Sequence, residues 1–201
     1  HPFNKDLSEM ENEPKGIILS GGPKSVNDPD APYLNKRIFD FDVPVLGVCY
    51  GLQILAHNAI PGSVEKAERR EFGRSELIVD DNTDLFKNIP QESIVWMSHG
   101  DHIQTLPADY EIIGHTDNAK VAAVRHKEKA IYGVQFHPEV VHTVYGKEIV
   151  ENFVRNICEL PGSWTAESFI ESTIQEIKER VGSDRVLCGL SGGVDSTVVA
   201  T

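Results

Sequence analysis

Cys49, His137 and Glu139 are the residues of this sequence whose types and spacing best suit covalent catalysis. Cys49 lies midway between Gly47 and Gly51, a spacing typical of a sharp strand-to-helix turn that presents a nucleophile above a sheet. A helix starting at this turn would point its N-terminus at the sulfur and favour the thiolate over the thiol. The alternative is a buried cysteine that only fills space, which is the commoner role of a cysteine.

The base would come from the segment IYGVQFHPEV, in which an alternating strand ends just before His137. A histidine next to a thiol can take its proton, and a carboxylate on the other ring nitrogen fixes the tautomer. Glu139 stands in the right place for that carboxylate, with Pro138 fixing the backbone between them. The three residues therefore predict acyl transfer through a thioester, provided that the fold brings both segments together.

A second motif, LSGGVDST, occupies residues 190–197. A glycine-rich turn between a strand and a helix can bind phosphate with its backbone N–H groups. The Gly-Lys-Ser signature of the Walker loop is missing. An incidental turn explains the motif equally well when it is taken alone.

The elements that must position these residues alternate between strands and helices, which indicates an α/β fold with a partly parallel sheet. The expected strands are residues 16–19, 43–48, 75–79, 93–97, 110–114, 121–125, 130–136 and 185–190. The expected helices are residues 31–41, 52–59, 144–157 and 166–181, the last ending before Gly182.

A Pro-Gly-Ser segment after Leu160 predicts a boundary between two domains, residues 1–160 and residues 161–201. A helix, a strand, a glycine loop and the first turns of another helix cannot enclose a core. We therefore interpret residues 161–201 as the beginning of a second α/β domain.

The amino-acid composition excludes several classes of function. The 201 residues include 19 basic and 31 acidic ones, and the net charge of −12 argues against a surface for nucleic acid or anionic membranes. No apolar run is long enough to span a bilayer. Three widely spaced cysteines suit a reducing cytoplasm and predict neither a disulfide framework nor a zinc site.

Together, GVCYGLQ, FHPE, SGGP and SHGD resemble the motifs of the class I, triad-type glutamine amidotransferases, in the order of that family. The resemblance implies a flavodoxin-like mixed sheet flanked by helices, and a metal-free glutaminase site. In it Cys49 attacks the side-chain amide of glutamine, His137 acts as base and then acid, and Glu139 orients the imidazole. The further site residues implied are Gly22 and Tyr50 for the oxyanion hole, and Gln53, Ser98, His99, Gly100 and Asp101 for glutamine.

The LSGGVDST motif resembles the pyrophosphate loop of enzymes that adenylate a substrate oxygen. Joined to a class I glutaminase, it resembles the GMP synthase family of ligases in purine biosynthesis. That family activates xanthosine monophosphate (XMP) with ATP and Mg²⁺, and ammonia from glutamine displaces the adenylate. The residues implied to bind ATP are Ser191, Gly192, Gly193, Val194, Asp195 and Ser196.

Three features depart from the family pattern. The family's first strand would precede His1, and both the rest of the nucleotide domain and a region that forms a homodimer would follow Thr201. Residues 56–64 also lack the paired glycines expected after the helix of the cysteine turn. Two alternatives stay open: a stand-alone glutaminase or amidotransferase subunit for another acceptor, and a non-catalytic domain with the amidotransferase fold.

Overall fold

The computed structural model describes residues 3–4, 12–162 and 166–200. The chain divides into two compact units, residues 1–160 and residues 161–201, and each is treated by itself below.

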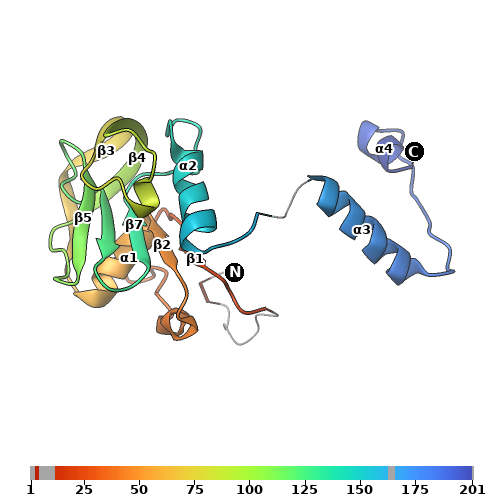
Figure 1. The fold of residues 1–201 in the computed structure, drawn as a ribbon, viewed down its shortest axis with the longest axis horizontal. Helices are drawn as coiled ribbons and strands as arrows, with labels where there is room; N and C mark the ends of the chain where they lie inside the picture. The colour runs from red at the N-terminus through yellow and green to blue at the C-terminus, as the bar shows by residue number, and fades with distance from the viewer. Residues whose placement is uncertain (1–2, 5–11, 163–165, 201) are drawn as a thin grey trace. The chain divides into compact units, whose positions relative to one another are not determined.

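The first unit is built on one mixed sheet, which has seven strands in the described residues (Figure 1). Their spatial order is β1-β2-β7-β6-β5-β3-β4. The strands are β1 (Ile17–Leu19), β2 (Val45–Val48), β3 (Val64–Val79), β4 (Glu92–Ile103), β5 (Tyr110–His115), β6 (Ala123–His126) and β7 (Ile131–Val134). Strands β1, β2 and β7 are parallel, and the remaining pairs are antiparallel. The partly parallel α/β sheet expected from the sequence is confirmed.

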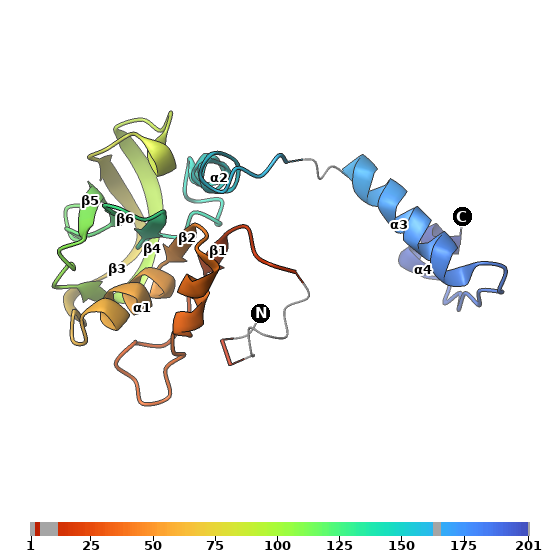
Figure 2. The same cartoon turned by 60° about the horizontal axis from the view of Figure 1, so that its bottom comes forward.

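Two helical layers cover the sheet, one on each face (Figure 2). Helix α1 (Tyr50–Ala59) follows β2 directly, and α2 (Gly146–Glu151) runs into the π-helix η4 (Asn152–Ile157). Because side chains alternate along a strand, β2 contributes to both layers. Val45 belongs to the same buried cluster as Leu55 of α1, whereas Leu46 and Val48 cluster with Ile149 of α2.

Two expected helices differ from the structure. Within residues 31–41 only the 3₁₀-helix η2 (Lys36–Phe41) forms, because Asn35 caps it by accepting a hydrogen bond from the Arg37 N–H at 3.1 Å. The helix expected over residues 144–157 begins at Gly146 and changes into the π-helix at Asn152. A further 3₁₀-helix, η3 (Asp84–Phe86), lies in a segment for which no element was expected.

Strands β3 and β4 are longer than the sequence predicts, because they pair as one antiparallel hairpin. A shift of register between Lys66 and Glu71 breaks the alternation of apolar residues in β3 and so conceals its first half. Residues 98–101, expected at a strand end, lie inside β4, which continues to Ile103.

The second unit contains α3 (Ala166–Val181), with the bounds that the sequence predicts, and α4 (Val194–Ala200). Gly182 follows α3 with a φ of 54°, the left-handed conformation typical of a helix end. The expected strand over residues 185–190 is wrong: the described residues 166–200 contain no strand, and Leu187 is 99% exposed. A strand needs a neighbour to take up its hydrogen bonds, and this unit offers none among those residues.

None of the helices in the described part of the chain has the length and apolar character needed to cross a membrane.

Candidate active site

The carboxyl ends of the three parallel strands meet at one edge of the sheet, where ligands bind in open α/β folds. Strand β1 leads there into residues 20–22, β2 ends just before Cys49, and β7 ends just before Gln135. Segments that are far apart in the sequence therefore converge at this edge, and they carry the cysteine and histidine motifs.

The turn at Cys49 requires its two flanking glycines. A Cβ on Gly51 would lie 2.0 Å from the carbonyl oxygen of Leu19, and a Cβ on Gly47 would lie 2.7 Å from the carbonyl carbon of Gly51. Cys49 itself has φ 50° and ψ −106°, which a non-glycine residue adopts only where its surroundings impose it. The close packing of β1, β2 and α1 holds the cysteine in this conformation at the edge of the sheet.

His137 is fixed through both its ring and its backbone. Its ring atom Nδ1 lies 2.7 Å from Oε1 of Glu139, whose side chain is 55% exposed. Its backbone N–H donates to the carbonyl of Trp96 at 3.0 Å. The Thr143 hydroxyl donates to the His137 carbonyl at 2.6 Å. A carboxylate thus orients the ring, and hydrogen bonds to β4 and Thr143 hold the backbone that carries it.

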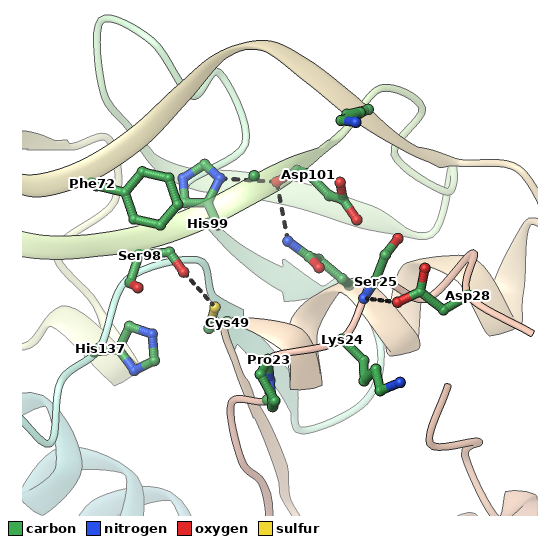
Figure 3. Close-up of a pocket in the computed structure, with 14 residues that line it drawn as sticks. Pro23, Lys24, Ser25, Asp28, Cys49, Phe72, Ser98, His99, Asp101 and His137 are labelled. Carbon is green, nitrogen blue, oxygen red and sulfur yellow. Dashed lines mark hydrogen bonds between the residues drawn. The ribbon is translucent and has the colours of Figure 1, made fainter. Parts of the chain in front are cut away.

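Cys49 and His137 lie together against Gly21. A Cβ built on Gly21 would meet Cε1 of His137 at 3.0 Å and Cβ of Cys49 at 3.6 Å. Figure 3 shows the imidazole and the sulfur on the same side of the cavity. The structure therefore brings the two predicted reactive residues into one site, with Glu139 behind the imidazole.

A cavity of about 570 Å³ opens above these residues. Most of the residues predicted for the glutaminase site line it, namely Gly22, Cys49, Gln53, Ser98, His99, Gly100, Asp101 and His137. Tyr50 and Glu139 do not line the cavity. Tyr50 is buried, and its hydroxyl donates a hydrogen bond to the Pro32 carbonyl at 2.5 Å.

Six further residues line the cavity that sequence reasoning missed: Pro23, Lys24, Ser25, Asp28, Lys66 and Phe72. Phe72 is 64% exposed, unusually so for a large apolar residue, and it follows the irregular part of β3. Only the arrangement of the β3–β4 hairpin over the sheet edge brings it here.

The surroundings of the Cys49 sulfur favour the protonated thiol. Burial raises the pKa of Cys49 to about 11, against the opposing effect of a hydrogen bond from the Tyr50 N–H. The thiol donates to the Ser98 carbonyl at a distance of 3.7 Å (Figure 3). The N–H at the start of α1 thus acts in the expected direction, towards the thiolate, but desolvation of the sulfur outweighs it. Attack would require a base.

Two buried amides lie beneath the sulfur. Nε2 of Gln135 lies 3.7 Å from Sγ of Cys49, and its Oε1 accepts a hydrogen bond from Nε2 of Gln53 at 3.2 Å. Gln53 also donates to the carbonyl of Asp101 at 3.1 Å. The sequence analysis did not predict Gln135 as a site residue. Its position two residues before His137, at the end of the same strand, could have indicated that it lies near the cysteine.

Another buried pair joins β3 to β4 beside the cavity. Nε2 of His99 lies 3.4 Å from Oε2 of Glu71, and Nδ1 of His99 lies 2.9 Å from the Asp101 carbonyl oxygen. Burial by itself would raise the pKa of Glu71, but the nearby His99 ring and hydrogen bonds from the hydroxyls of Ser75 and Thr116 together hold it below its usual range. The pair links the two strands at His99, which lines the cavity.

In the second unit, the predicted ATP-binding residues 191–196 form the glycine turn and the first turn of α4. Gly192 has φ 81°, and the Thr197 N–H donates to the Gly193 carbonyl at 3.2 Å as the helix begins. In the described parts of the chain, no group of three or more His, Cys, Asp or Glu residues is placed to hold a metal ion. Asp195 is the carboxylate of this turn, and a Mg²⁺ that accompanies a nucleotide generally uses one or two carboxylates plus phosphate oxygens.

Comparison with known proteins agrees with the motifs and the geometry. The family model for "Glutamine amidotransferase class-I" matches residues 1–157. The chain belongs to the class I glutamine amidotransferases. The family resemblance drawn from the motifs is confirmed.

Relatives of this amidotransferase chain include the GMP synthase [glutamine-hydrolyzing] of Synechococcus sp., which is 51% identical over 187 residues. That match covers 93% of this chain and 35% of the relative. The enzyme of the same name from Brachyspira hyodysenteriae is 48% identical over 201 residues, which are 100% of this chain and 39% of the relative. The chain thus spans little more than a third of the length of these relatives.

Among solved structures, a Thermoplasma acidophilum protein assigned as one subunit of a GMP synthase superposes with a TM-score of 0.67 at 31% identity. The match covers 89% of this chain and 83% of that one. A glutamine amidotransferase from Thermotoga maritima superposes with a TM-score of 0.55 at 20% identity, which supports the fold alone.

Proposed function

We propose that this chain is the glutamine-hydrolysing part of a GMP synthase, which supplies ammonia for the ATP-dependent amination of XMP to GMP. The observation that carries the proposal is the meeting of Cys49 and His137 against Gly21, at the wall of a cavity, with Glu139 on the far nitrogen of the imidazole. A buried thiol with a raised pKa needs such a base.

In the proposed reaction, His137 takes the proton of the Cys49 thiol while the sulfur attacks the side-chain amide carbon of glutamine. The backbone N–H groups of Gly22 and Tyr50 would stabilise the oxyanion, a contribution of about 2.7–4 kcal/mol per donor in comparable sites. The carbon–nitrogen bond then breaks, and His137 returns the proton to the leaving ammonia. Water, activated by His137, hydrolyses the γ-glutamyl thioester to glutamate and restores the thiol.

The wall formed by α1 and β4 would hold the amino-acid head group of glutamine. Ser98, His99, Gly100 and Asp101 line the cavity on the β4 side. Nε2 of Gln53 already donates to Asp101 and Gln135, so Gln53 would bind the substrate ammonium through its oxygen.

The nucleotide half of the reaction would begin at the turn of residues 191–196, which would bind the phosphates of ATP with Mg²⁺. Its support is the glycine turn ahead of α4 and the name shared by the relatives. XMP binding and assembly into a homodimer would use parts of the enzyme outside these residues, and the enzyme would work in the cytoplasm.

The test is Cys49→Ala in the full-length enzyme. Glutamine-dependent formation of GMP should be abolished, whereas synthesis from ammonium should persist, because ammonia enters after the missing step. Cys158→Ala, a half-buried cysteine outside the cavity, is the matched control and should retain both activities. Loss of the ammonium reaction in Cys49→Ala would contradict the division into two sites.

The two alternatives predict other results. A stand-alone glutaminase would release glutamate at one rate whether or not ATP and XMP are supplied. A non-catalytic domain would leave Cys49 unmodified by an electrophile that mimics glutamine.

A further inference from the structure

Gln135 is a fully buried amide that touches the sulfur and has no part in the proposed reaction so far. It is 1% exposed and follows β7 directly. Its orientation follows from its neighbours. The Asp101 carbonyl can only accept, so the Gln53 atom that faces both Asp101 and Gln135 is the nitrogen. Gln135 therefore turns its oxygen to Gln53 and its NH₂ group to Sγ of Cys49, 3.7 Å away.

The two polar partners of the sulfur act on opposite charge states. The Ser98 carbonyl, 3.7 Å from Sγ, can only accept, so it favours the protonated thiol. The Gln135 amide nitrogen can only donate, so its interaction with sulfur strengthens when the sulfur becomes negative. Once His137 has taken the proton, Ser98 repels the thiolate and Gln135 still attracts it.

We propose that Gln135 is a further catalytic residue of this site, donating a hydrogen bond that stabilises the Cys49 thiolate. Gln53 is a positioning residue, because its own donation to the Gln135 oxygen keeps the Gln135 NH₂ group directed at the sulfur. The inference rests on the proposed thioester chemistry, in which the thiolate is the attacking species.

Other charged groups lie near this sulfur, and their positions must not change in the variants used for a test. Those that line the same cavity are Lys24, Asp28, Lys66, His99, Asp101 and His137, and Glu139 lies behind His137. None of their side chains is hydrogen-bonded to Gln135 in the described residues, so Gln135 variants leave their contacts in place.

The experiment is alkylation of Cys49 by iodoacetamide in the full-length enzyme, followed at the Cys49 peptide by mass spectrometry between about pH 7 and 9. Gln135→Leu removes the donor and should lower the thiolate fraction about tenfold, the usual effect of losing one hydrogen bond to a charged group. The rate should fall only about three- to fourfold, because a more basic thiolate attacks faster. Gln135→Met is similar in length and also lacks a donor, so it should slow alkylation to a similar extent.

Gln53→Leu should slow alkylation by a smaller factor, and Gln53→Leu combined with Gln135→Leu should match Gln135→Leu alone, since Gln53 acts on the sulfur through Gln135. The matched control is Gln104→Leu, an exposed glutamine outside the cavity, which should alkylate like the wild type. If Gln135→Leu does not fold, the alkylation rate of Gln135→Met tests the inference in its place.

Unchanged alkylation in both Gln135 variants would overturn the inference while leaving the proposed function intact. Failure of the proposed function has a different signature, namely a wild-type Cys49 that resists an electrophile mimicking glutamine. A slower rate in the Gln135 variants with a normal rate in Gln104→Leu supports the inference, because a merely structural role would not alter the ionisation of one thiol.

Discussion

Replacing Gly51 by alanine tests whether close packing behind the turn holds the nucleophile in place. The new Cβ would lie 2.0 Å from the carbonyl oxygen of Leu19 and 2.7 Å from its carbonyl carbon, whereas real Cβ atoms essentially never come within 3.0 Å of a neighbour. The start of α1 must therefore retreat from β1 by about 1 Å. Pairing of Leu19 with Gly47 holds β1 and β2 in register, so the displacement falls on Cys49.

A misplacement of about 1 Å at a reacting group costs on the order of 10²-fold in rate, and crowding of this kind typically costs 1–3 kcal/mol of stability. The assay is the initial rate of glutamate release by the full-length enzyme, with glutamine, ATP and XMP supplied, together with thermal unfolding of the same sample. Gly189→Ala is the matched control, because no described heavy atom lies within 4 Å of the Cβ it would add. A Gly51→Ala enzyme with a rate within about threefold of wild type, and an unchanged melting temperature, would refute the reasoning.

Three further outcomes are expected. Glu139→Ala should slow glutamate release about tenfold, less than the roughly 10²–10⁴-fold loss in His137→Ala, because an exposed carboxylate only orients the base; equal losses would contradict this order. Arg125→Met removes a cation shared by three carboxylates and should cost roughly 1–2 kcal/mol at neutral pH. Hydrogen bonds from Thr83 and, to a smaller extent, the charge of Arg125 lower the pKa of Asp81, one of these carboxylates. The Arg125 contribution is therefore present above the unfolded pKa of Asp81 and is lost as pH falls through the folded value; an equal effect of the substitution at about pH 3 would count against the network. Asp195→Ala should abolish the stimulation of glutamate release by ATP with XMP, typically about 5–150-fold for coupled sites, and a preserved ratio would show that the loop does not carry the coupling.

The sequence by itself determined the parts of the site that depend on neighbouring residues. Glycines two positions on either side of Cys49 predicted a turn that only glycines can close, and the structure places backbone atoms within 2.7 Å of the Cβ that each would carry. The histidine and the glutamate two residues later form the expected ring-to-carboxylate contact. Helix α3 was equally predictable, because its apolar period and its terminal Gly182 are local signals.

Only the tertiary structure decided the features that depend on residues far away in the chain. The register shift in β3 exists only as a pairing with β4, so periodicity could not reveal that residues 98–101 lie inside a strand. Residues 185–190 have the composition of a strand but no pairing neighbour among the described residues around them, so a strand-like pattern produced no strand. The pKa of Cys49 also depends on residues far away in the chain. The sequence predicts the helix that starts at Cys49, but the desolvation that raises the pKa of its thiol arises from side chains that the whole fold packs around the sulfur.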